Sequence, residues 1–212
     1  MPDNRCWMIT NLAYAQGNHY TGAGAWSSTT TVPYYTDPHA DSTVHDGGVS
    51  GDGVACPSPS YRMSANQINY TECGFLYNWP AVTAATICPT GWSLPTGSNG
   101  QANTTNNDFH ALYQSLGTSK TGRFTALVGT GSLWKGVYSG YFNTVDALFS
   151  LGIIQVGQGA AYWSSTAATE LGDGFRRTFG YSTSGVGLNN DVAGTSASRS
   201  ASGNAIRCVA NK

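Results

Sequence analysis

Hydrophobic and aromatic positions are densest between Cys73 and Pro95, in a chain otherwise rich in Gly, Ser, Thr and Asn. This segment reads CGFLYNWPAVTAATICPTGWSLP. Because aromatic side chains bury the most area per residue, we expect the core to assemble around it. Residues 74–82 fit either a strand or a short helix, because periodicity does not separate the two in so apolar a run. Pro80 suits the first turn of a helix that continues to about Thr86, and a turn is expected from Cys88 to Trp92.

The clearest helical pattern begins after Asn107, which is a favourable N-cap residue and is followed by Asp108 in the first turn. Apolar residues then recur at the spacing i, i+3, i+4 and i+7: Phe109, Leu112, Tyr113 and Leu116. Gly117 is expected to end this helix. His110 lies beside the apolar stripe, and we place it at the rim of the core and not among ligands.

Strand patterns lie at both ends of the chain. Residues 4–14 predict a strand that enters a turn at Asn11, with three inward positions: Trp7, Ile9 and Leu12. From residue 162 onward the pattern is β, and four residues alternate on one strand: Phe175, Arg177, Phe179 and Tyr181. Residues 205–210 predict the last strand. We expect Phe175 and Phe179 in the core, and Trp163 packed against Trp92.

The segments between these elements are harder to assign. Residues 118–161 have no sustained period, and we expect only short mixed elements there. Residues 15–60 form a loop-rich insertion that contains the only cluster of His and Asp residues. Four of these are weak candidates for calcium, zinc or another metal: Asp37, His39, Asp41 and His45. No EF-hand or HExxH pattern is present, so a solvated polar loop is the simpler interpretation and no cofactor is predicted.

Charged residues make up only 10% of the 212 residues, against roughly 25% in typical soluble domains. Uncharged polar groups must therefore keep the protein in solution, as in secreted β-rich modules. The net charge is −1 and no basic stripe is present, which argues against nucleic acid as a partner. No apolar run is long enough for a membrane span. No signal peptide is present, and we expect the chain to start inside or at the edge of a longer protein.

The five cysteines stand at positions 6, 56, 73, 88 and 208, and none has the CxxC spacing of zinc or redox motifs. Wide spacing suits disulfides that close long loops in an oxidising compartment. We expect the pairs Cys88–Cys208 and Cys56–Cys73, which leaves Cys6 free. Buried free thiols are the alternative, because unpaired cysteine is also commonly buried.

A succession of motifs spans about the whole chain: CWMITNLAY, GFLYNWPAVTA, ICPTGWSLPT, NDFHALYQSLG, AYWSSTA and a terminal AIRCVA. Together they resemble the Fibrobacter major paralogous domain, which is related to the C-type lectin fold and its formylglycine-generating branch. The resemblance implies a single α+β domain over residues 1–212. Its N- and C-terminal strands would be paired, with one or two helices and long polar loops. It also implies secretion or display on the cell surface.

Residues 162–208 resemble, more loosely, the C-terminal segment of the variable proteins of diversity-generating retroelements. In those proteins, residues altered by mutagenesis at adenines line a binding surface. The candidate ligand-binding residues here are Thr166, Glu170, Asp173, Arg176, Tyr181, Thr183, Leu188, Asn189, Asn190, Asp191 and Arg199. Tyr and Arg would be the anchors, since both are enriched among the residues that dominate binding energy. Ordinary polar loops have the same composition.

No catalytic signature is present: the chain lacks a GxSxG motif, a P-loop and a dinucleotide fingerprint. The formylglycine-generating relatives use a pair of cysteines near the C-terminus, whereas this chain has Cys208 alone there. The motifs of calcium-dependent lectins are also missing near Asn189–Asp191. We therefore expect a non-enzymatic protein that binds a protein or glycan on another cell or surface. A fixed structural or adhesion module of a larger surface protein is the alternative, and a formylglycine-generating enzyme is less favoured.

Overall fold

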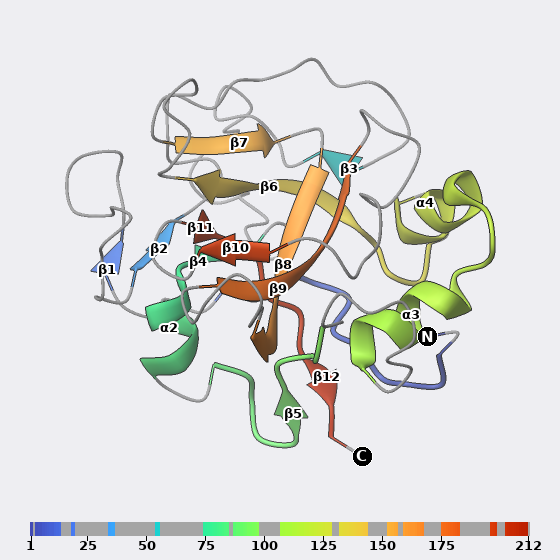
Figure 1. Cartoon of the computed structure of the whole chain (residues 1–212), viewed down its shortest axis with the longest axis horizontal. Helices are drawn as coiled ribbons and strands as arrows, with labels where there is room; N and C mark the ends of the chain where they lie inside the picture. The colour runs from blue at the N-terminus through green and yellow to red at the C-terminus, as the bar shows by residue number, and fades with distance from the viewer. Residues whose placement is uncertain are drawn as a thin grey trace, which may run out of the picture.

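A computed structural model describes residues 1, 3–13, 18–19, 34–36, 54–55, 74–84, 87–97, 107–128, 132–143, 152–156, 159–167, 175–182, 196–198 and 202–211. All structural statements below concern these residues. They form a mixed structure of short helices and mainly antiparallel strands (Figure 1). The predicted α+β class is confirmed at this level.

The helices are α2 (Trp79–Ala84), α3 (Asp108–Ser115) and α4 (Lys120–Val128). The early strands are β1 (Asn18–His19), β2 (Tyr34–Thr36), β3 (Val54–Ala55), β4 (Leu76–Tyr77) and β5 (Trp92–Ser93). The later strands are β6 (Val137–Asn143), β7 (Gly152–Val156), β8 (Gly159–Ala167), β9 (Phe175–Ser182), β10 (Ser196–Ser198), β11 (Ser202–Gly203) and β12 (Val209–Ala210). Figure 1 shows α3 and α4 on one side of the central strands and α2 on the other.

The largest sheet has seven strands, with β10, β9, β8, β6 and β11 in that order and with β3 and β7 paired to β6. Strands β8 and β9 are antiparallel, and Tyr162 lies opposite Phe179 while Ala160 lies opposite Tyr181. Strand β8 is parallel to β6. Within the described residues, β8 and β9 therefore lie inside this sheet, each with a neighbouring strand on both sides.

The N- and C-terminal segments are paired, as predicted. Trp7 forms an antiparallel bridge with Val209, and the Met8 amide donates to the Cys208 carbonyl at 3.0 Å. Strand β12 pairs in turn with β5. One detail of the prediction is wrong, because Ile9 is 46% exposed. Asn11, where the turn was expected, is buried.

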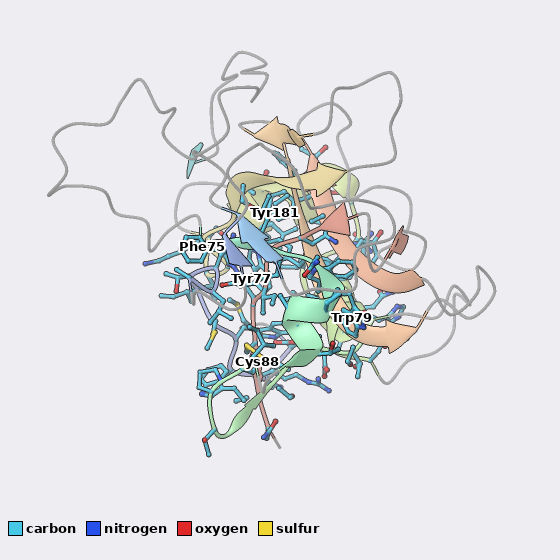
Figure 2. All side chains as sticks on the ribbon, turned by 90° about the vertical axis from the view of Figure 1, so that its left-hand side faces the viewer. Phe75, Tyr77, Trp79, Cys88 and Tyr181 are labelled. Carbon is cyan, nitrogen blue, oxygen red and sulfur yellow. A yellow bond between two sulfur atoms is a disulfide. The ribbon has the colours of Figure 1, made fainter. Side chains whose placement is uncertain are left out.

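The interior contains two hydrophobic clusters. The first packs α3, α4 and Trp7 against one face of β8 and β9, and its buried aromatic residues are Trp7, Phe109, Trp134, Tyr162, Phe179 and Tyr181. The second lies around α2 and the C-terminal segment and includes Tyr77, Trp79 and Cys88 (Figure 2), together with Trp163, Ile206 and Cys208. Trp163 contacts Trp79 edge-on, with ring centroids 5.5 Å apart. The partner of Trp163 is thus Trp79, whereas Trp92 is half-buried at the edge of this cluster.

The disulfide between Cys88 and Cys208 is present, which confirms that pair. It joins residues 120 positions apart, and the two cysteines are 3% and 0% exposed. Among the described cysteines, Cys6 is free and exposed, as expected for the unpaired thiol. Cys56 and Cys73 lie outside the described residues, so their pairing stays a prediction.

Helix α3 forms where its start and stop signals predict it. The Asn107 side chain accepts a hydrogen bond from the His110 amide at 2.8 Å, and Gly117 follows α3 with a φ of +114°. Pro80 lies in the first turn of α2, which begins after Asn78. Helix α4 was not predicted, because Gly122 and threonines dilute its apolar period.

Candidate functional site

Strands β8 and β9 of the C-terminal segment contribute large side chains to both hydrophobic clusters. Tyr162, Phe179 and Tyr181 are buried in the first cluster, while Trp163 on the same strand as Tyr162 is buried in the second. Strand β8 therefore contacts both clusters, one through each face. Such positions have little freedom to change, because interiors are close-packed.

Tyr181 belongs to this buried set, which corrects its assignment as a ligand-binding anchor. It is 1% exposed, and its hydroxyl lies 3.2 Å from the hydroxyl of Tyr162 (Figure 2). A ligand outside the protein cannot reach a side chain at this depth. Tyr181 was expected to be an anchor because Tyr is enriched in binding surfaces, but here it lies two positions after the buried Phe179 and shares its face of β9.

Arg207 is a buried cation that the sequence analysis did not single out. It is 0% exposed, and Nε donates to Asn11 Oδ1 at 2.7 Å. Its other nitrogens donate to the carbonyls of Trp134 and Lys135. The guanidinium also lies over the Trp134 ring, 4.6 Å from the centroid. Arg207 thereby holds the C-terminal segment in place through uncharged acceptors and an aromatic face, which is a structural role.

The backbone at Lys135 adapts to this contact. Lys135 has a φ of +48°, a left-handed conformation that non-glycine residues rarely adopt. Its carbonyl accepts from Arg207 at 2.9 Å. A hydrogen bond to a charged donor is stronger than one between neutral groups, so this carbonyl is well satisfied.

A β-bulge on β8 separates the buried part of the segment from its exposed part. Trp163 pairs with Thr178, but the next pair is Ala167 with Arg176, so β8 contains extra residues between them. Within the bulge Ser164 is buried, Ser165 is exposed and Thr166 is half-buried. Bulges turn side chains to new directions at the ends of strands, and here the bulge brings Ser165 to the surface.

The bulge is fastened to the loop that follows β5. The Ser165 amide donates to the Pro95 carbonyl at 2.8 Å, and the Gly97 amide donates to Thr166 Oγ1 at 2.9 Å. These bonds replace the pairing with β9 that the bulge interrupts. Thr166 therefore has a backbone partner already, and its hydroxyl helps to position the loop.

The same loop is fixed to the start of α3. Asp108 Oδ2 accepts from the amide of Thr96 at 2.7 Å and from its hydroxyl at 2.9 Å. Arg5 forms an ion pair with Asp108. A carboxylate at a helix N-terminus is also favoured by the helix dipole. The bulge, the loop and α3 are thus joined by one hydrogen-bonded polar network.

Four strand or loop ends gather beside this bulge, and we call them the stem cluster: Gly97, Ala167, Phe175 and Ser198. Ala167 lies next to Arg176 in the register, and Ser198 lies opposite Phe175. The Gly97 amide reaches Thr166, the neighbour of Ala167. The connections 98–106, 168–174 and 199–201 all start or end at the stem cluster.

The candidate ligand-binding residues fall into two groups, according to whether the connection that contains them starts or ends at the stem cluster. Glu170 and Asp173 belong to the connection 168–174, and Arg199 directly follows β10. The remaining connection, 183–195, begins at Ser182 at the far end of β9 and contains Thr183, Leu188, Asn189, Asn190 and Asp191. All of these residues lie outside the described part of the chain. The Arg176 backbone lies in β9 between Ala167 and Ala197.

The metal candidates Asp37, His39, Asp41 and His45 also lie outside the described residues. Within the part that is described, no group of three or more His, Cys, Asp or Glu side chains is close enough to hold a metal ion. His110 lies half-buried on α3, and its ring nitrogen is 3.4 Å from the Gln114 amide nitrogen. It is a rim residue, as expected.

No family model, no curated protein and no solved structure matches this chain. Among the described helices, none is long and apolar enough to cross a membrane.

Proposed function

We propose that this chain is a non-enzymatic ligand-binding protein, secreted or displayed on a cell surface. Its scaffold is C-type-lectin-like, and residues 162–208 present the binding face to a protein or glycan. The paired chain ends, the helices packed beside the sheet and the buried disulfide support this proposal. Disulfides persist in oxidising compartments outside the cytosol.

The stem cluster is the observation that carries the proposal. Strand β9 contributes to the first hydrophobic cluster and β8 to both, and the Arg207 guanidinium lies over the Tyr162 ring of β8. The network around Asp108 holds the loop that ends at Gly97. Binding residues work best on connections that a rigid scaffold positions. Glu170, Asp173 and Arg199 all belong to connections that start or end there, whereas Tyr162, Trp163, Phe179 and Tyr181 on β8 and β9 are buried.

Two libraries would test this division of roles. The first randomises Glu170, Asp173 and Arg199, and the control randomises the buried Tyr162, Phe179 and Tyr181. Both are displayed on yeast and selected against hen egg-white lysozyme as a defined protein probe. We expect wild-type display and recovered binders from the first library, and lost display from the control.

Two results would contradict the proposal. Lost display in the first library would assign its three residues to the scaffold. Full display without any binders would show that these connections do not form a usable binding face.

The encoding locus tests the finer proposal of retroelement diversification. We expect a near-copy of the coding segment for residues 162–208, differing mainly at adenines, beside a reverse transcriptase gene. A locus without both features would favour the second candidate, a fixed adhesion or structural module within a larger surface protein. Oxidation of the buried Cys208 favours both candidates over a formylglycine-generating enzyme, because that enzyme needs a reactive C-terminal thiol pair.

A further inference from the structure

We draw no further inference here: the strongest candidate, the half-exposed apolar face that Met8, Trp92 and Leu94 form on the ladder of the two chain ends and β5, carries none because nothing in the structure shows what covers it.

Discussion

The guanidinium of Arg207 connects parts of the chain that are far apart in sequence. Asn11 is 196 positions away and Trp134 is 73 positions away. A buried charge is tolerated only when its hydrogen-bonding groups are satisfied. Here carbonyl and amide oxygens satisfy them, together with two aromatic faces at 4.6 and 5.5 Å.

Arg207→Met should lower the free energy of unfolding by at least about 3 kcal/mol, because buried acceptors lose a charged donor. Equilibrium unfolding in urea measures this change, provided that the m-value is the same as in the wild type.

Arg123 is a matched control, since its guanidinium also lies over an aromatic ring but is only half-buried. Arg123→Met should cost less than about 1 kcal/mol. If Arg207→Met does not fold, Arg207→Lys is used for the same comparison. Equal losses at both arginines would refute the role of Arg207.

Tyr181→Ala should destabilise the protein by about 3–5 kcal/mol, the usual cost of removing a large buried aromatic side chain. Its thermal midpoint should fall accordingly. Ser165→Ala, at an exposed position of β8, should change the stability by no more than about 0.5 kcal/mol. An unchanged midpoint for Tyr181→Ala would return this residue to the candidate binding set.

At the scale of elements, α3 shows how local signals and packing act together. Asn107 caps the first turn through a 2.8 Å hydrogen bond, and Phe109 and Leu112 are buried on the face that the periodicity predicts. Each signal is local in sequence, which explains why the helix and its ends were predictable.

Asn107→Ala should cost about 1 kcal/mol, because the His110 amide loses its acceptor. Asn107→Asp keeps an acceptor oxygen at the same position and should retain most of the stability. Chemical denaturation of the two variants provides the comparison. The capping role would be rejected if Asp were as damaging as Ala.

The β8 bulge illustrates an element that sequence patterns could not locate. The sequence pattern correctly predicted strands at residues 162–167 and 175–182, but it does not reveal the bulge between Trp163 and Ala167. The bulge depends on two hydrogen bonds with a loop about 70 residues earlier in the chain: the Ser165 amide donates to the Pro95 carbonyl, and Thr166 Oγ1 accepts from the Gly97 amide. Such a partner is defined only when both segments are packed on the same core.

At the scale of the whole molecule, the chain closes on itself. The N-terminal segment pairs with the C-terminal segment, and the Cys88–Cys208 disulfide fastens that closure. A disulfide that closes so long a loop lowers the conformational entropy of the unfolded chain. On the chain-entropy model this raises the free energy of unfolding by about 5 kcal/mol.

Replacing both Cys88 and Cys208 by Ala should therefore lower the free energy of unfolding by several kcal/mol, up to about 5 kcal/mol. Equilibrium unfolding in urea measures the loss. Cys6→Ser is the control, because Cys6 is free and exposed, and it should leave the midpoint nearly unchanged. A double variant as stable as the wild type would mean that hydrophobic packing alone closes the domain.

The sequence by itself determined the features whose causes are local or compositional. These are helix α3 with its caps and the strand pattern of residues 162–167 and 175–182. The α+β class was implied by the family resemblance, and Cys88–Cys208 was the preferred pair with buried free thiols as its alternative; the structure confirms both expectations. Tertiary structure alone decided which alternating residues face the core, so that Tyr181 is buried and Ser165 is exposed. It also decided the partners of Arg207 and Trp163, and the gathering of the stem cluster. Strand alternation separates two faces but does not tell which neighbour covers each, because that depends on segments distant in the chain.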